Sequence, residues 1–363
     1  MVLYFFKIIW YNYIKIIRRM PMTVGESISK HRKELGISQE ALGKKLLVSR
    51  QTVSLWEKDR TVPTIDNLIR LKEIFGVSVD EILCCTEDKK EKMETNLHSL
   101  DTICSALAYA MGIEPPKAAS EKNWELSNYV DKIFDGEKAD RVVIYNNAAI
   151  AQWVYKKYGD YFKGTKKRTG IEIFLSAVMP SVTPVGLATM YTGVQPEVHG
   201  IRKYEKPVLK TETLFDALIA AGKKPAVVSY RKCSLGRLFL ERNMDYYNFE
   251  DGGIEDVNAK VVELILRDEH DVIVFFNGDY DSVMHKTGPE SARALADLRV
   301  SDHVFSLISD IIKNNWQHHN TLIGFATDHG CHEIDGGCGS HGLNMVEDIN
   351  IVHLYKGYPR TDK

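Results

Sequence analysis

Carboxylate and imidazole side chains lie just after several of the apolar runs in this sequence. They are Asp281, His285, Asp328, His329 and His341. Asp and His are the ligands that zinc or manganese takes from proteins, and this number of oxygen and nitrogen donors suits one or two adjacent divalent ions. The sequence therefore predicts a metal site, with zinc preferred and manganese as the alternative.

A hydroxyl that can act as a nucleophile lies elsewhere in the chain. Thr183 directly precedes Pro184 and the helix-like run VGLATMYTG, so its hydroxyl is expected at a helix N-terminus, where an anion is favoured. Coordination to a metal would lower the pKa of this hydroxyl enough for attack on phosphorus. Paired ions about 3.5 to 4 Å apart can stabilise both the attacking and the leaving oxygens. These residues together indicate metal-assisted phosphoryl transfer.

The elements that must position these groups are short apolar runs rich in Val, Ile or Phe, most of them separated by helical stretches. The runs span 141–145, 171–175, 225–229, 271–276, 322–326 and 349–355. Such alternation predicts an α/β domain with a mostly parallel sheet covered on both faces. Its functional groups are expected beyond the carboxyl ends of the strands.

A different pattern occupies residues 23–85. Ser38 and Ser49 each open a short helical run in the manner of an N-cap, which predicts two capped helices back to back. Leu42, Val53 and Trp56 have the spacing of a shared core, whereas Arg50, Gln51, Thr52 and Ser54 point elsewhere. Two further helices follow, so this part is expected to be a small all-α domain. A helical bundle that makes only protein contacts is the alternative.

The segment SQEALGKKLLVSRQTVSLWEKDRTVPTIDNLIRLKEIFGVSVDEIL resembles the helix-turn-helix domain of the Cro and phage-repressor family. The resemblance implies binding to double-stranded DNA, usually as a homodimer, with the second helix of the pair in the major groove. By position the base-reading residues are Arg50, Gln51 and Ser54, with Thr52 beside them. The residues expected at phosphates are Gln39, Lys44, Lys45, Lys58 and Arg60.

The segments PSVTPVGLATMYTGVQPEVHGI, DYDSVMHKTGP, ATDHG and GSHG resemble, in this order, the alkaline phosphatase superfamily, nearest to its type I phosphodiesterase/nucleotide pyrophosphatase branch. The resemblance implies a three-layer α/β fold and a phosphate ester or nucleotide-like substrate. It assigns Asp281, His285 and His341 to one ion. Asp328, His329 and the nucleophile Thr183 would face the other ion. Tyr204 falls where relatives bind a phosphate oxygen.

One position departs from that family. Relatives end the first strand of this domain with an Asp that ligates the same ion as the nucleophile, whereas this strand ends Tyr145-Asn146-Asn147-Ala148. Asn147 or Ala148 takes the place of the carboxylate, and a neutral amide such as Asn147 is a weaker ligand for a borderline cation. Two functions therefore remain open: a DNA-binding protein with a working phosphoesterase, or a transcriptional regulator whose degenerate phosphatase-like domain senses a phosphorylated ligand.

Length and composition bound the rest. The chain has 363 residues and a formal net charge of -2, so any DNA binding must come from a local surface. The expected parts are an apolar and basic extension at 1–22, the helix-turn-helix domain at 23–85, a linker at 86–101 and the α/β domain at 102–363. The extension has too many charges for a stable membrane span. Six scattered cysteines fit a reducing cytoplasm.

Two other groups of metal-binding residue types carry less weight. Cys331, His332, Cys338 and His341 lack the paired CxxC units of a zinc finger. The polar segment WQHHN, which contains His318 and His319, is expected to face solvent.

Overall fold

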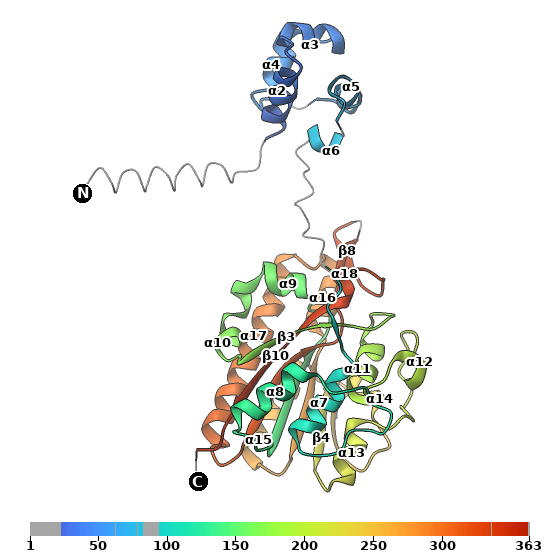
Figure 1. Ribbon diagram of the computed structural model, residues 1–363, viewed down its shortest axis with the longest axis vertical. Helices are drawn as coiled ribbons and strands as arrows, with labels where there is room; N and C mark the ends of the chain where they lie inside the picture. Colours follow the sequence, from blue (N-terminus) through green and yellow to red (C-terminus); the bar gives the residue numbers. More distant parts are fainter. Residues whose placement is uncertain (1–22, 62, 78, 83–93, 335, 362–363) are drawn as a thin grey trace, which may run out of the picture. The chain divides into compact units, whose positions relative to one another are not determined.

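The computed structural model describes residues 23–361 apart from positions 62, 78, 83–93 and 335 (Figure 1). Two units divide the chain, Met1–Met93 and Glu94–Lys363. The predicted extension at 1–22 and the first part of the predicted linker lie outside the described residues.

The first unit is helical, as predicted. Its helices are α2 (Val24–Glu34), α3 (Gln39–Leu46), α4 (Arg50–Trp56), α5 (Ile65–Phe75) and α6 (Val79–Ile82). Ser38 Oγ accepts the Ala41 N–H at 3.1 Å and Ser49 Oγ accepts the Thr52 N–H at 3.0 Å, so the two predicted N-caps are present. The caps fix where α3 and α4 begin and therefore which residues of α4 face outward.

This unit has its own apolar core, which includes Leu42, Val53 and Trp56. A buried ion pair adds to it: Arg32 Nη2 donates to Glu57 Oε2 at 3.0 Å, and Arg32 Nη1 donates to the Ile37 carbonyl at 2.8 Å. The pair joins α2 to the end of α4, so the orientation of the exposed face of α4 depends on it.

The second unit is built on an eight-stranded sheet of order β1-β3-β10-β7-β2-β6-β4-β5. The strands are β1 (His98–Ser99), β2 (Arg141–Asn147), β3 (Ile171–Ser176), β4 (Pro225–Tyr230), β5 (Asp245–Phe249), β6 (Val272–Asn277), β7 (Thr321–Thr327) and β10 (Asn350–Tyr358). All neighbours are parallel except β10, which runs antiparallel to both β3 and β7. The prediction of a mostly parallel sheet is confirmed.

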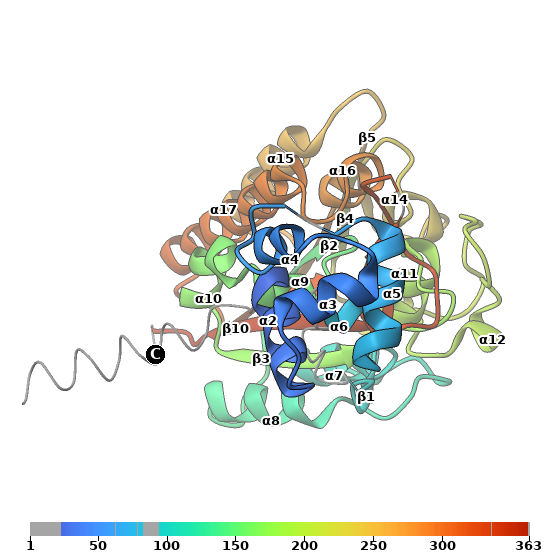
Figure 2. The ribbon, with the colours of Figure 1, turned by 90° about the horizontal axis from the view of Figure 1, so that it is seen from above.

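Helices cover both faces of this sheet (Figure 2). On one face lie α10 (Lys163–Lys167), α15 (Ile254–Arg267) and α17 (Ala292–Asn315), and on the other lie α7 (Thr102–Ala110), α8 (Trp124–Ile133), α11 (Thr183–Thr192) and α13 (Leu214–Ala220). The central strands β4, β6 and β7 are buried along their whole length, which explains why they read as unbroken apolar runs. The three-layer α/β prediction is confirmed.

Shorter elements complete the described part of this unit. They are α9 (Gln152–Lys157), the 3-10 helix η1 (Gly159–Phe162), α12 (Pro196–His199), α14 (Leu235–Leu238), α16 (Asp279–Thr287), α18 (Val346–Ile349) and the hairpin of β8 (His332–Ile334) and β9 (Cys338–Ser340). Of these, α16 and the hairpin bear directly on the candidate site.

The linker prediction is wrong at its C-terminal end, because residues 94–101 belong to the second unit. The Asn96 N–H donates to Asn350 Oδ1 at 3.1 Å, and β1 pairs in parallel with β3. A strand of two residues carries no periodicity, so the polar sequence around it reads as linker. The strand β5 was also missed, because DYYNF at the sheet edge is partly exposed and polar.

Candidate functional site

Three neighbouring strands bring the predicted metal ligands to one edge of the sheet. The strand β2 lies between β6 and β7, and its last residue, Asn147, is in register with Asn277 and Thr327. Asp328 is the residue that follows β7, and α16 begins two residues after β6. The carboxyl ends of parallel strands meet at one edge, which is why groups far apart in sequence become neighbours here.

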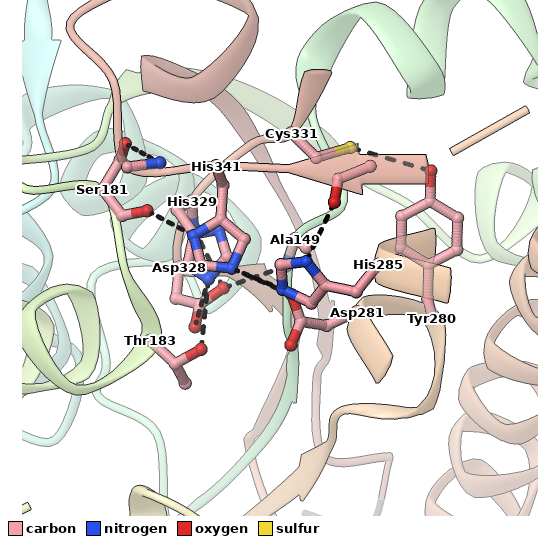
Figure 3. A network of polar contacts seen from close by, with 12 residues as sticks. Ala149, Ser181, Thr183, Tyr280, Asp281, His285, Asp328, His329, Cys331 and His341 are labelled. Carbon is pink, nitrogen blue, oxygen red and sulfur yellow. Dashed lines mark hydrogen bonds and ion pairs between the residues drawn. The ribbon is translucent and has the colours of Figure 1, made fainter. Parts of the chain in front are cut away.

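Asp281, His285 and His341 converge at this edge (Figure 3). Asp281 and His285 are one turn apart on α16, and His341 directly follows β9. His285 Nε2 lies 3.0 Å from His341 Nε2, and Asp281 Oδ1 lies 3.4 Å and 3.2 Å from these two nitrogens. Bonds of about 2.0 to 2.1 Å to a tetrahedral zinc separate its ligand atoms by about 3.3 Å. The spacing fits one zinc-sized ion.

The protonation state of three histidines is fixed by backbone carbonyls. His285, His329 and His341 each place Nδ1 between 2.9 and 3.0 Å from a carbonyl oxygen. These carbonyls belong to Gly339, Gly330 and Ser181, respectively. A carbonyl only accepts, so each Nδ1 carries a hydrogen, and Nε2 is the atom that a neutral ring would offer to an ion. This is the arrangement in which proteins prepare histidines for a metal.

A second set of groups gathers around Thr183, which is the first residue of α11 and is buried. Its Oγ1 lies 3.1 Å from His329 Nε2, which can accept the hydroxyl hydrogen (Figure 3). Asp328 Oδ1 accepts the N–H groups of Ala149 at 3.2 Å and of His329 at 2.9 Å. The carboxylate is therefore held by its Oδ1 atom, which leaves Oδ2 facing the site.

Three buried oxygens at this edge have no hydrogen-bond partner among the described residues: Asp281 Oδ1, Asp328 Oδ2 and Asn147 Oδ1. Burying such an oxygen unpaired is costly, and a cation would satisfy it. Burial raises the pKa of Asp328 to about 7, and repulsion from Asp281 adds to this shift. Burial also opposes ionisation of Asp281, but interaction with the imidazoles of His285 and His341 holds the pKa of Asp281 well below its ordinary value. The donor set fits a first divalent ion, whereas a second ion would have Asp328 as a carboxylate ligand and only the neutral amide of Asn147 beside it.

A cavity of about 550 Å³ opens beside the nucleophile candidate. Thr183 and Tyr204 both line it, so the structure brings these two predicted residues to the same space. Its wall carries four cationic side chains, Lys206, Arg231, Lys286 and Arg293, together with the carboxylates of Asp279, Asp281 and Asp297. Sequence reasoning missed these four cationic residues, although Lys286 is the neighbour of His285. The cavity has room for a ligand larger than phosphate itself.

Several supporting residues were also missed. Ser181 accepts from His341 through its carbonyl, and its hydroxyl accepts the Gly342 N–H at 3.2 Å. The buried Asp348 contacts His332 Nδ1 at 2.7 Å through Oδ1 and the Leu343 N–H at 2.9 Å through Oδ2. These contacts clamp both flanks of the loop that carries His341. Only the motif GSHG gave a sequence signal for this loop.

The four residues of the alternative zinc-finger reading do not form a metal cluster among the described residues. Cys331 is buried with its sulfur 3.8 Å from the Tyr280 hydroxyl, away from His341 (Figure 3). His332 is engaged by Asp348. The cysteines therefore do not contribute to the metal centre.

On the first unit, the outward face of α4 carries the predicted base-reading residues. A hollow of about 370 Å³ is lined by Arg50, Gln51, Ser54, Leu55 and Lys58. Arg60 is exposed, as are Lys44 and Lys45 on α3. Two predicted contacts are partly engaged within the domain: Gln39 Nε2 donates to Glu57 at 2.9 Å, and the Thr52 hydroxyl lies 2.9 Å from that of Ser49.

Comparison with known proteins agrees with both resemblances. The helix-turn-helix family model matches residues 28–82. The model of type I phosphodiesterase/nucleotide pyrophosphatase matches residues 166–359, more than half of the chain. The chain therefore belongs to the type I phosphodiesterase/nucleotide pyrophosphatase family, and it carries a helix-turn-helix domain of the transcription-regulator kind ahead of that domain.

Curated relatives match the N-terminal part. Repressor protein C2 of Salmonella phage P22 is 33% identical over 112 residues, which are 28% of this chain and 50% of the relative. The regulator DicA of Escherichia coli is 39% identical over 69 residues, 19% of this chain and 51% of the relative. This chain thus spans about half the length of the curated relatives it matches.

Among solved structures, murine ectonucleotide pyrophosphatase/phosphodiesterase 5 is similar over 55% of this chain and 59% of its own, with 15% identity and a TM-score of 0.45. Within the described residues, none of the helices combines the length and the apolar character needed to cross a bilayer.

The close packing of α11 against Asp328 can be tested by adding a methyl group at Gly186. A Cβ atom on Gly186 would lie 2.6 Å from the Asp328 carbonyl oxygen, so Gly186→Ala must displace α11 or the strand end. We expect it to lower the free energy of unfolding of the second unit by about 1 to 3 kcal/mol, measured by thermal denaturation. Gly253→Ala is the matched control, because a Cβ there meets nothing within 4 Å. Equal effects of the two substitutions would mean that this contact does not constrain the site.

Proposed function

We propose that this protein is a sequence-specific DNA-binding regulator whose second unit is a metal-dependent phosphoesterase with Thr183 as the nucleophile. The substrate is a phosphate ester of nucleotide-like size. The ions are zinc, with manganese as the alternative, and number one or two per chain.

One observation carries the catalytic part of the proposal. His285, His341 and Asp281 present three ligand atoms 3.0 to 3.4 Å apart, beside a buried threonine whose hydroxyl contacts a third prepared histidine. Two imidazole nitrogens and a carboxylate oxygen that face one another at these distances are the three-ligand arrangement that an ion between them would satisfy.

The chemistry follows from where these groups lie. The Thr183 hydroxyl lies 3.1 Å from His329 Nε2, the atom that would hold an ion beside it, and the start of α11 favours the negative charge that develops at the Thr183 oxygen. The Thr183 oxygen gives its hydrogen to water and forms a bond to phosphorus as the bond from phosphorus to the leaving oxygen breaks. Water then cleaves the phosphothreonine, and the leaving alcohol takes up a proton. The bound ions would lower the pKa of the hydroxyl and stabilise charge on the phosphoryl oxygens.

The cavity residues supply binding. Lys206, Arg231, Lys286 and Arg293 face an anionic substrate, and Tyr204 lies among them. Cationic side chains around a phosphoryl group stabilise both its binding and the charge of the transition state. A substrate with a further anionic group beyond the reacting phosphate suits this wall best.

Removal of the nucleophile tests the catalytic role. Thr183→Ala is expected to abolish hydrolysis of a chromogenic phosphodiester by the zinc-loaded or manganese-loaded chain, and chelation with EDTA is expected to do the same. Thr192→Ala is the matched control on the same helix, since its hydroxyl bonds to the backbone at the end of α11, donating to the Ala188 carbonyl and accepting the Val194 N–H. Turnover that persists in Thr183→Ala would mean that another group attacks phosphorus.

A second function is favoured by the end of β2. Asn147 stands where the family resemblance places a carboxylate. A neutral amide is a poorer ligand, so the ion that would activate the nucleophile binds more weakly. Under this second function the domain binds a phosphorylated small molecule without hydrolysing it. The ligand changes the affinity of the protein for DNA because it binds two conformations of the protein with different affinities.

The variant Asn147→Asp distinguishes the two proposed functions. If the domain is degenerate, the new carboxylate is expected to raise the zinc content from one ion to two ions per chain and to create or increase turnover. Elemental analysis after dialysis gives the count. Asn146→Asp is the control, because the Asn146 amide is directed at the Tyr191 hydroxyl, 2.8 Å away. Two ions and full turnover in the unaltered chain would overturn the sensing function.

DNA binding is proposed to use the exposed face of α4, in a homodimer on a near-palindromic site. Gln51→Ala is expected to cost about 1 to 3 kcal/mol of binding free energy and to relax specificity at one base position. Lys58→Ala should weaken binding uniformly across sequences and reduce the salt dependence by about one charge. Titration of a selected operator at several salt concentrations measures both. Unchanged operator binding by Gln51→Ala would mean that α4 does not read bases in the major groove.

The protein is proposed to act in the cytoplasm. DNA binding requires access to the chromosome, and the four cysteines in the described part of the chain are all free.

A further inference from the structure

A second cluster of metal-binding residue types lies at the opposite end of the sheet from Thr183. Asp268 follows α15 and precedes β6, while His318 and His319 precede β7. The cluster therefore lies at the amino ends of the same two strands whose carboxyl ends lead to Asp281 and Asp328. The expectation that WQHHN faces solvent holds for half-exposed His318 and is wrong for His319, whose side chain is mostly buried.

Both imidazoles are directed at one carboxylate. His318 Nε2 lies 3.1 Å from Asp268 Oδ2, and His319 Nε2 lies 2.8 Å from the same oxygen. The two rings are 4.0 Å apart at their centroids. Two nitrogens and one carboxylate oxygen thus share one small space, with each nitrogen in hydrogen-bond contact with the oxygen and nearer to it than the ~3.3 Å expected between ligand atoms of a tetrahedral ion.

The carboxylate is held from its other side. Arg141 Nε donates to Asp268 Oδ1 at 3.0 Å, and Arg141 Nη1 donates to Asp271 Oδ1 at 2.9 Å. Asp271 balances the guanidinium charge, so the negative charge of Asp268 remains available to a cation on the Oδ2 side. Charged partners that orient a ligating carboxylate in this way are typical of metal sites.

The backbone around the cluster is also constrained. Asp268 adopts a left-handed conformation with φ of 52°, which ends α15 and directs the side chain outward from the helix end. Trp316 Nε1 donates to the Ile265 carbonyl at 2.9 Å, and the His319 N–H donates to the Trp316 carbonyl at 3.0 Å. These bonds tie the end of α15 to the end of α17. The backbone segments that carry the three side chains are therefore already held close together.

We propose that Asp268, His318 and His319 form a separate divalent transition-metal site, of the zinc class, that joins the turn before β6 to the turn before β7. Each neutral ring binds through Nε2 and carries its hydrogen on Nδ1. The half-exposed His318 leaves the fourth position open to water. The site is distant from the hydrolytic edge, so its role is to stabilise the second unit by binding the folded state.

The test uses the full chain with the other metal centre disabled by Asp281→Asn and Asp328→Asn. Zinc content after dialysis, and the rise of the unfolding midpoint with added zinc, are compared with and without His318→Ala and His319→Ala. We expect the double substitution to remove one zinc per chain and to abolish the zinc-dependent rise. The control is His303→Ala, an exposed histidine on α17, which should leave both unchanged.

A milder variant keeps the test decisive if the double substitution unfolds the unit. His318→Gln alters only a half-exposed side chain, and we expect it to weaken zinc affinity at this site by about tenfold or more in the same background. Equal zinc content and affinity in His318→Gln and His303→Ala would overturn the proposal, and the cluster would then be an ion pair that only supports the fold.

Discussion

The pairing of β2 with β6 on one side and β7 on the other is the constraint on which the second unit depends. Its register places Asn147, Asn277 and Thr327 side by side at the carboxyl edge, and Val142, Val272 and Leu322 side by side near the amino edge. One set of backbone hydrogen bonds therefore positions two separate clusters of carboxylates and imidazoles. A shift of the register would displace both clusters together.

Electrostatics explains why the carboxyl edge of the sheet is suited to a bound cation. Asp281 and Asp328 repel each other in a buried space, and burial with this repulsion raises the pKa of Asp328 to about 7. Three histidines donate their Nδ1 hydrogens to backbone carbonyls, which directs Nε2 of each ring toward the other groups of the site. Two carboxylates and three imidazoles thus converge in one space, where a bound cation would satisfy their oxygens and nitrogens together.

The two units join different kinds of surface on one chain. The first has its own apolar core and presents polar and basic side chains on α4, whereas the second presents a cavity beside Thr183 that is lined by both basic and acidic side chains. The proposed DNA surface uses a small number of side chains centred on one short helix, which is compatible with a net charge of -2 for the whole chain. The proposed substrate cavity, in contrast, draws its residues from distant parts of the second unit.

The sequence alone determined much of this architecture. Apolar runs bounded by helical stretches predicted β2, β3, β4, β6, β7 and β10, because strands buried on both faces read as continuous Val, Ile and Phe. The caps at Ser38 and Ser49 predicted where α3 and α4 begin, since capping is a local interaction. The short edge elements β1 and β5 were missed because their stability comes from pairing and not from their own pattern.

The tertiary structure decided what the histidines can do. The family resemblance of the sequence motifs grouped Asp281, His285 and His341 around one ion, but only the fold directs each Nδ1 to a carbonyl and each Nε2 to its neighbours. It also brought His318 and His319 to Asp268, although 49 residues or more separate them along the chain. Residue types and local motifs are written in the sequence, whereas hydrogen-bond partners and ligand spacing arise from strand register and the packing of distant loops.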